Sequence, residues 1–235
     1  MLAVVFGSSG GIGRALAEGV IASRNYTAVY AVSRSGAEIK GAFNRRAEFT
    51  DEAQLASLSA EIGGAGPVTL CLVASGLLSA DGVQPEKTYR ALSADAFARV
   101  FAANTIAPAL IAKHMLALMP KAERSVFAAL SARVGSISDN RLGGWHAYRA
   151  SKAALNMLIR NFAIEQARRA PGSICVGLHP GTVDTGLSKA FQGAVPGENL
   201  FTPEQSAGYL LDVIDRLSPE DSGKCFDWAG KEVPA

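Results

Sequence analysis

Short apolar segments alternate along the chain with longer segments of helical pattern, and this alternation constrains the fold more than any single motif does. The apolar segments are Leu2–Phe6, Ala28–Val32, Val68–Val73, Ser125–Leu130, Ile174–Leu178 and Lys224–Asp227, with a weaker one at Ala47–Phe49. They lack strict alternation of apolar and polar residues, which is typical of strands buried on both faces. Helices are predicted over Gly13–Ser23, Asp51–Ile62, Ala94–Met119, Ala147–Arg168 and Pro203–Leu217. This order predicts an α/β fold: a doubly wound parallel sheet of about seven strands with helices on both faces.

Composition and charge narrow the classes of function. The chain has 235 residues, of which 49% are apolar and 19% charged, and this favours one globular domain over residues 1–235. The net charge of +2 gives no footprint for a polyanion, so no nucleic-acid partner is expected. No stretch of about 18 apolar residues lacks a charge, so no membrane span is expected.

The chain start and the cysteines indicate a reducing compartment. The apolar start ends at Gly7, too early for a signal peptide, so a cytoplasmic location is expected. Cys71, Cys175 and Cys225 lie far apart in apolar segments. They are therefore predicted to be core residues, and no metal site is expected.

A glycine-rich turn, Gly7-Ser8-Ser9-Gly10-Gly11-Ile12-Gly13, follows the first predicted strand and opens the first predicted helix. Glycines allow a tight turn and a close approach of the backbone to a phosphate, while the helix N-terminus supplies free N–H groups. The context favours dinucleotide binding, and an ordinary strand–turn–helix is the alternative.

The end of the second predicted strand carries Ser33-Arg34-Ser35. An acid at this place, about 20 residues after the glycines, would bind the ribose 2′-hydroxyl of NAD. This chain has Arg34 instead, and a guanidinium can hold a 2′-phosphate. The residue favours NADP(H) over NAD(H), and a solvated loop charge is the alternative.

Two features of the predicted helices carry possible chemistry. Tyr148 and Lys152 share one helix face because four residues separate them. An ammonium near a phenol favours the phenolate, so the pair can act as a proton donor and acceptor. Asn104 lies four residues before Pro108, which lacks an N–H, so the helix should be irregular there and leave the carbonyl of Asn104 free.

Taken together, these motifs resemble the short-chain dehydrogenase/reductase family, with its single-domain Rossmann fold. The resemblance runs from Leu2 to about Trp228 and includes Pro180-Gly181-Thr182-Val183-Asp184-Thr185 at a strand end. Within the family it is nearest to carbonyl reductase-like and C-factor-like members, through Gly135-Ser136-Ile137-Ser138-Asp139-Asn140 and the segment from Tyr148 to Asn156.

The resemblance implies a role for each matching residue. Tyr148 would be the proton donor or acceptor, Lys152 would lower its pKa and bind the nicotinamide ribose, and Asn104 would hold a water through its carbonyl. The implied cofactor-binding residues are Gly7, Ser9, Gly11, Ile12, Gly13, Ser33, Arg34, Phe49, Ala74, Ser75, Gly76, Tyr148, Lys152, Pro180, Gly181, Val183 and Thr185. A basic residue often precedes the second glycine in NADP-dependent members, but Gly10 stands there, which leaves the cofactor preference to Arg34.

The resemblance also implies a catalytic serine at the end of the fifth strand, and here it leaves a choice. Ser131 directly follows Ser125–Leu130 and is the first candidate, with Ser136 as the second. Alignment on Gly135 instead places Ala132 at this position. The hydroxyl would hydrogen-bond the substrate oxygen.

The predicted function is NADP-dependent hydride transfer between NADP(H) and a small carbonyl or alcohol substrate. The resemblance also implies assembly as a homodimer or homotetramer. Residues 185–201 are predicted to form a substrate loop or lid. A non-catalytic NADP-binding signalling protein of C-factor type is the alternative. A sugar-nucleotide epimerase would need a further substrate domain, and a methyltransferase would leave Arg34, Tyr148 and Lys152 without a role.

Overall fold

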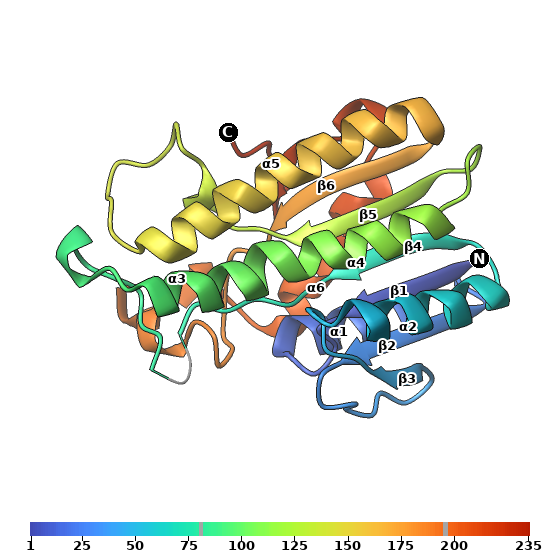
Figure 1. Cartoon of the computed structure of the whole chain (residues 1–235), viewed down its shortest axis with the longest axis horizontal. Helices are drawn as coiled ribbons and strands as arrows, with labels where there is room; N and C mark the ends of the chain where they lie inside the picture. Colours follow the sequence, from blue (N-terminus) through green and yellow to red (C-terminus); the bar gives the residue numbers. More distant parts are fainter. Residues whose placement is uncertain (80–81, 195–196) are drawn as a thin grey trace.

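In the computed structural model, residues 1–79, 82–194 and 197–235 are described, and they form one central sheet flanked by helices (Figure 1). The strands of this sheet are β1 (Leu2–Phe6), β2 (Ala28–Ser33), β3 (Phe43–Arg46), β4 (Val68–Val73), β5 (Ser125–Leu130), β6 (Ser173–His179) and β9 (Cys225–Asp227). The longer helices are α1 (Gly11–Ser23), α2 (Glu52–Ala65), α3 (Ala94–Phe101), α4 (Ala107–Met115), α5 (His146–Arg169) and α6 (Pro203–Arg216).

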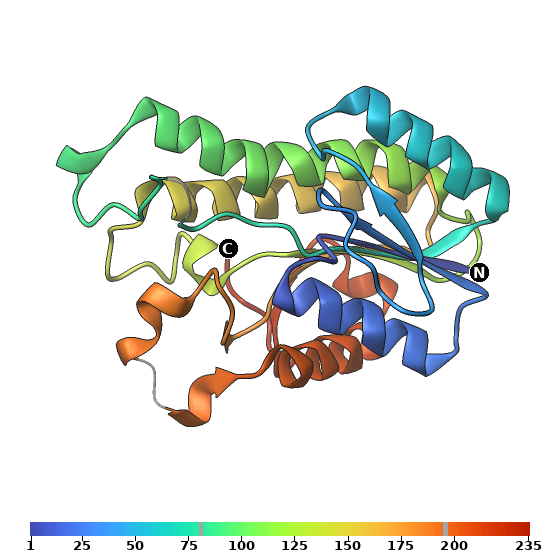
Figure 2. The ribbon, with the colours of Figure 1, turned by 90° about the horizontal axis from the view of Figure 1, so that it is seen from below.

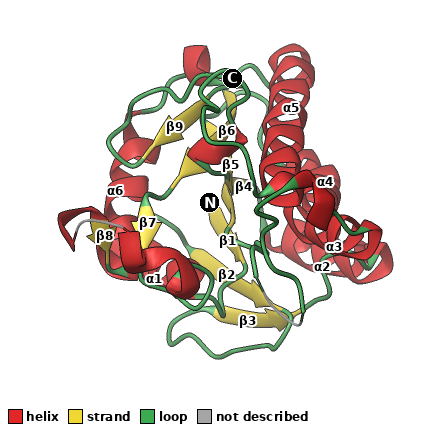
Figure 3. Cartoon of the chain, turned by 90° about the vertical axis from the view of Figure 1, so that its left-hand side faces the viewer, coloured by secondary structure: helices red, strands yellow, loops and turns green. Residues whose placement is uncertain are grey.

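The sheet confirms the predicted doubly wound arrangement. Its seven described strands run in the order β3-β2-β1-β4-β5-β6-β9, and every neighbouring pair is parallel. Helices α2 to α5 cover one face and α1 and α6 the other (Figures 2 and 3). The strand order reverses between β1 and β4, where open α/β sheets bind their ligands.

Two apolar layers, one on each face of the sheet, form the core. Val4 and Phe6 of β1 pack with the side of α2, α4 and α5, whereas Ala3 and Val5 pack with α1 and α6. All four side chains are fully buried. The strand segments are apolar throughout because both of their faces are covered.

The position predicted for the third strand was wrong. Strand β3 is Phe43–Arg46, an edge strand with an exposed Phe43, and the predicted Ala47–Phe49 follows it as a loop. Phe49 is buried there because its ring packs edge-on against Phe6, with ring centroids 5.6 Å apart. An edge strand that is open to solvent on one side needs no apolar run, whereas the loop that seals the core does.

The long predicted helix Ala94–Met119 is helical from Ala94 to Leu118 and contains the expected irregularity. A π-helical turn, Ala102–Ile106, joins α3 to α4 and includes Asn104. Such turns occur mostly where a helix serves a functional site. By length and composition this is the one helix within the described ranges that could cross a membrane, but 44% of its most apolar window is buried inside the fold. Here it is a core helix, with Ile111 and Met115 fully buried.

The predicted lid, residues 185–201, follows the short strand β7 (Thr182–Val183). It contains two 3-10 turns, Lys189–Ala194 and Gly197–Asn199, and ends in the short strand β8 (Leu200–Phe201), which pairs with β7. Residues 195 and 196 of this segment lie outside the described part of the chain. The base of the segment is fastened by the Ser188 hydroxyl, which donates to the carbonyl of Val183. A lid function and the single-domain assignment of residues 1–235 stay predictions.

Candidate active site

The glycine-rich turn brings β1, α1 and the segment after β4 into close contact. Gly7 has a φ of +84°, and a Cβ atom there would lie 2.7 Å from the backbone nitrogen of Ser75. A Cβ atom on Gly13 would lie 2.1 Å from the carbonyl oxygen of Gly7. Only glycine fits at both positions, so the turn depends on the absence of side chains.

This turn has the features of a phosphate cradle. Helix α1 has Gly10 as its N-cap, with no side-chain hydrogen bond, so the first N–H groups of the helix remain open to a ligand. The hydroxyl oxygens of Ser8 and Ser75 are buried and have no hydrogen-bond partner among the described residues. Unpartnered buried hydroxyls are costly unless a ligand or water satisfies them, so a polar cofactor fits this cradle.

A cleft of about 290 Å³ lies beside the cradle and brings several of the predicted cofactor-binding residues together. Arg34, Phe49, Ser75 and Gly76 line it, together with Arg99, which the sequence analysis missed. Ser33 is placed differently, because its buried hydroxyl accepts the N–H of Ala37 and so holds the turn after β2.

Tyr148 and Lys152 lie on the first turns of α5, as predicted. The ammonium of Lys152 is 5.7 Å from the centroid of the Tyr148 ring and donates to the carbonyl of Leu130 at 2.7 Å. Burial lowers the pKa of Lys152 to about 8 and raises the pKa of Tyr148 to about 12. The sequence predicted that Lys152 would lower the pKa of Tyr148. This was wrong, because burial of the phenol dominates and raises that pKa.

Asn104 connects three elements of the site. Its side-chain oxygen accepts the N–H of Leu77 at 2.7 Å, and its amide nitrogen donates to the Leu77 carbonyl and to the Ser151 hydroxyl. Ser151 in turn donates to the carbonyl of Tyr148 at 2.7 Å. Asn104 is fully buried, so this network fixes the π-helical turn, the segment after β4 and the start of α5 relative to one another.

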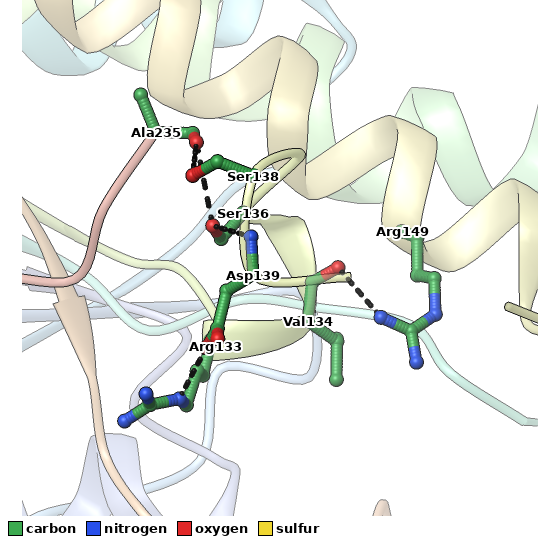
Figure 4. Close-up of polar contacts among 7 residues, drawn as sticks. All are labelled: Arg133, Val134, Ser136, Ser138, Asp139, Arg149 and Ala235. Atoms are coloured by element: carbon green, nitrogen blue, oxygen red, sulfur yellow. Dashed lines mark hydrogen bonds and ion pairs between the residues drawn. The ribbon is translucent and has the colours of Figure 1, made fainter. Parts of the chain in front are cut away.

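The two serine candidates lie in different surroundings. Ser131 lines the cleft with Tyr148, but its hydroxyl donates to the side-chain oxygen of Asn156 at 2.6 Å. Ser136 does not line this cleft, and its hydroxyl donates to the Ala235 carbonyl and accepts the N–H of Asp139 (Figure 4).

Ala132, the third residue that the alignment allowed, lines the cleft with a side chain that has no donor. Ser131 is thus the one of the two serines that reaches the cleft, and its proton is already used.

The cleft beside Tyr148 has a volume of about 280 Å³. Pro180, Gly181, Val183 and Thr185 form one side of it, together with Ile12 of α1. A Cβ atom on Gly11 would lie 2.9 Å from the Thr185 methyl group, and a Cβ atom on Gly76 would lie 3.8 Å from the ammonium of Lys152. The phosphate cradle and the Tyr148 cleft are therefore parts of one continuous site.

The comparisons with known proteins agree with this geometry. Residues 1–194 match the family model for the short chain dehydrogenases. The chain belongs to the short-chain dehydrogenase family. It is an oxidoreductase of this family by fold and by sequence.

Three relatives illustrate the similarity. The chain is 39% identical to the C-signal of Myxococcus xanthus over 137 residues, which are 58% of this chain and 77% of that protein. It is 39% identical to the 1-hydroxy-2-glutathionyl-2-methyl-3-butene dehydrogenase of Rhodococcus sp. (strain AD45) over 134 residues, 57% of this chain and little more than half, 56%, of that protein. The NADPH-bound carbonyl reductase from chicken fatty liver superimposes with a TM-score of 0.86 at 27% identity, covering 99% of this chain and 98% of that one.

Some residues of this short-chain dehydrogenase site carried no sequence signal. The buried Glu86 accepts the N–H of Ala147 with its carboxylate and the N–H of Trp145 with its carbonyl, and so caps the start of α5. It lies in a long loop without a motif. Trp145 lines the cleft of Tyr148, and its ring packs edge-on against the Tyr148 ring.

His179, at the end of β6, also lines the cleft and was not assigned from the sequence. Burial lowers its pKa to about 4; the charge of Arg133 acts in the same direction and that of Asp227 in the opposite one. The imidazole is therefore neutral near pH 7, and its buried Nδ1 atom has no partner among the described residues.

Proposed function

We propose that this protein is an NADP(H)-dependent oxidoreductase that interconverts a small carbonyl compound and its alcohol. The observation that carries the proposal is the continuity of two features: a glycine cradle with two unpartnered buried hydroxyls, and a cleft in which Tyr148 lies beside Lys152. The cradle accounts for a dinucleotide and the cleft for a proton transfer.

The residues that would hold the cofactor run along the carboxyl ends of β1, β2, β4 and β6. Gly7, Ser9, Gly11 and Gly13 would surround the phosphates, and Arg34 would bind the 2′-phosphate in the cleft that it lines with Phe49. Ala74, Ser75 and Gly76 would lie beside the adenine ribose. Ile12, Pro180, Gly181, Val183 and Thr185 would contact the nicotinamide, because they line the cleft of Tyr148. Ser33 would act indirectly, through the turn that positions Arg34.

When bound, NADPH supplies a hydride, two electrons and one proton, to the carbonyl carbon. The electron pair of the C=O π bond moves to the oxygen, and Tyr148 gives that oxygen its phenolic proton, so the product is an alcohol. With a pKa of about 12, Tyr148 is fully protonated near pH 7 and suits this role of acid. In oxidation the same phenolate oxygen would take the proton of the alcohol.

Lys152 would stabilise the phenolate that remains after proton transfer. Its ammonium lies 5.7 Å from the ring centroid in a buried site, where a charge acts more strongly than in water. It would also bind the hydroxyls of the nicotinamide ribose. Asn104 would hold a water through its backbone carbonyl, because its side-chain amide is fully used by Leu77 and Ser151.

Ser131 would hydrogen-bond the substrate oxygen only by exchanging its bond to Asn156. A hydroxyl has a single proton, so it cannot donate to both acceptors at once. The proposal therefore gives Tyr148 the larger share of the stabilisation of the substrate oxygen and Ser131 the smaller.

The relatives support the cofactor and the reaction. The chicken carbonyl reductase that superimposes on this chain has NADPH bound, and the Rhodococcus relative is named as a dehydrogenase of 1-hydroxy-2-glutathionyl-2-methyl-3-butene, an alcohol. Assembly as a homodimer or homotetramer and a cytoplasmic location stay predictions.

Parallel calorimetric titrations with NADPH and NADH, followed by turnover of NADPH with a set of aldehydes, ketones and quinones, test the proposal. We expect tighter binding of NADPH, and a loss of turnover of at least about 100-fold in Tyr148→Phe with cofactor binding kept. Ser131→Ala should lose much less.

Tighter binding of NADH would contradict the role of Arg34. Binding of NADPH without turnover in the wild-type protein would favour the non-catalytic signalling function instead.

A further inference from the structure

The cleft of Tyr148 contains one permanently charged group. Among the described residues that line it, Arg133 alone carries a full charge near pH 7, since His179 is neutral. Most of the other residues that line this cleft are apolar, among them Leu78, Trp145 and Leu187. A substrate in this cleft therefore meets a proton donor and, separately, a cation, with mostly apolar surface around them.

The backbone that carries Arg133 is firmly held. Arg133 begins a 3-10 turn, Arg133–Gly135, in which the N–H of Ser136 bonds the Arg133 carbonyl at 3.0 Å. The turn packs tightly on α5, because a Cβ atom on Gly135 would lie 2.8 Å from the Cβ atom of Lys152. Beyond the turn, the Ser138 N–H donates to the Ala235 carbonyl at 3.0 Å. The Ser138 hydroxyl donates to the same carbonyl (Figure 4). The backbone position from which the Arg133 side chain extends is thus fixed.

The guanidinium is only partly used by the protein. Its Nε atom donates to a carboxylate oxygen of Asp139 at 2.7 Å. Neither Nη atom has a partner within the described part of the chain, and both lie on the side turned away from Asp139 (Figure 4). The side chain is 56% exposed. Two parallel N–H donors in this fork match a carboxylate bidentately.

We propose that the substrates of this protein are carbonyl compounds that bear an anionic group, a carboxylate in the simplest case, which Arg133 binds while Tyr148 faces the carbonyl oxygen. The proposal rests on the proposed function and names its substrate class. Asp139 holds the guanidinium through Nε and leaves the Nη edge for the ligand, so this ion pair orients the arginine rather than competing with the substrate.

Two probes that differ in one charge test the inference: para-carboxybenzaldehyde and its uncharged methyl ester. The ratio of their kcat/KM values is measured with NADPH for the wild-type protein and for Arg133→Gln. We expect the ratio to fall about 10-fold in Arg133→Gln, mainly through the KM of the carboxylate, with an unchanged Kd for NADPH. Arg133→Lys should recover part of the ratio, because it keeps the charge without the fork.

Arg141→Gln is the matched control, because Arg141 is an exposed arginine of the same loop that does not line the cleft. A second measurement needs no turnover: para-methylbenzoate is titrated into the NADPH-loaded protein and followed by NADPH fluorescence. We expect binding in the wild type and in Arg141→Gln and its loss in Arg133→Gln.

The outcomes separate the inference from the proposed function. Turnover of the ester with an unchanged ratio in Arg133→Gln overturns the inference and leaves the proposed function standing. A raised Kd for NADPH, with both probes slowed equally, also overturns it and assigns Arg133 to the cofactor. If neither probe is reduced, the proposed function fails for them, and the benzoate titration still decides whether Arg133 binds an anion.

Discussion

The two halves of the site are built on opposite principles. At the phosphate cradle, Gly7 and Gly13 leave space, and the backbone N–H groups at the start of α1 would bind the phosphates in the proposed function. At the catalytic cleft, buried polar side chains fill space: Lys152 bonds the Leu130 carbonyl, and Asn104 bonds Leu77 and Ser151. Gly7 and Gly13 of the first half leave no room for a side chain, whereas Lys152 and Asn104 of the second are held by hydrogen bonds to buried partners.

This difference determines how each half responds to substitution. A methyl group added at Gly7 or Gly13 would overlap backbone atoms, which cannot move away. Such a change should therefore lower both the stability of the fold and the affinity for the cofactor. Removal of a polar partner in the cleft leaves a buried group unsatisfied, which costs less in packing but disturbs proton chemistry. The cradle is thus expected to report through stability and cofactor affinity, and the cleft through pH dependence.

The largest effect is expected for Gly13→Ala. The new Cβ atom would lie 2.1 Å from the Gly7 carbonyl oxygen, so the turn must open. We expect a loss of about 3 kcal/mol in the free energy of unfolding, measured by urea denaturation, and near-complete loss of NADPH binding by calorimetry.

Gly10→Ala is the control for this variant, because the nearest atom to its new Cβ would be 3.5 Å away, an ordinary contact. Stability and affinity should stay close to wild type. A Gly13→Ala variant that binds NADPH normally would show that the turn is not the cradle.

The sequence predicted the local motifs of the site but not its contacts between distant segments, for a physical reason. The glycine turn and the Tyr148–Lys152 pair are local patterns, so their spacing was enough to place them. The partner of Ser131 is Asn156, far along the chain, and only the folded structure reveals that its proton is used. The capping of α5 by Glu86 is likewise a contact between distant segments.

The predicted position of the third strand and the predicted pKa of Tyr148 were wrong for related reasons. An edge strand needs little apolar sequence, so the apolar loop residue Phe49 misplaced it. The effect of Lys152 on Tyr148 was predicted from proximity, but the degree of burial, which dominates the pKa, is a property of the whole fold.

An intermediate effect, specific to the catalytic half, is expected for Lys152→Met. The pKa of Lys152 is lowered from 10.5 to about 8, so between these values the unfolded chain binds more protons than the folded one. The contribution of Lys152 to the free energy of unfolding should therefore rise from pH 8 towards pH 10.5, by about 3 kcal/mol in full. In Lys152→Met this rise should disappear.

The comparison is made by urea denaturation from pH 7 to pH 10. The buried thiols of Cys71, Cys175 and Cys225 and the phenol of Tyr148, whose pKa values burial raises, act in the opposite direction above about pH 9, because the folded chain then keeps protons that the unfolded chain loses. The quantity compared is therefore the difference in the free energy of unfolding between wild type and Lys152→Met, in which these contributions cancel. Lys121→Met, a change at an exposed lysine, should retain the rise. An equal slope in wild type and Lys152→Met would mean that the ammonium is solvated rather than buried.

The smallest effect is expected at the entrance of α5, in Glu86→Ala. The carboxylate of Glu86 accepts the N–H of Ala147, in a helix that is not capped by the side chain of its N-cap residue, Trp145. Loss of such a cap costs about 1 kcal/mol in the free energy of unfolding. Because Tyr148 follows Ala147 directly, kcat should fall several-fold while NADPH affinity is kept.

Glu86→Gln separates the hydrogen bond from the charge, since the amide oxygen can still accept the Ala147 N–H. It should retain most of the stability and of kcat, and Glu165→Ala, at an exposed position on the same helix, should change neither. If Glu86→Ala instead weakened NADPH binding as strongly as it lowered kcat, the two halves of the site would not be separable. The start of α5 would then belong to the cradle as much as to the cleft.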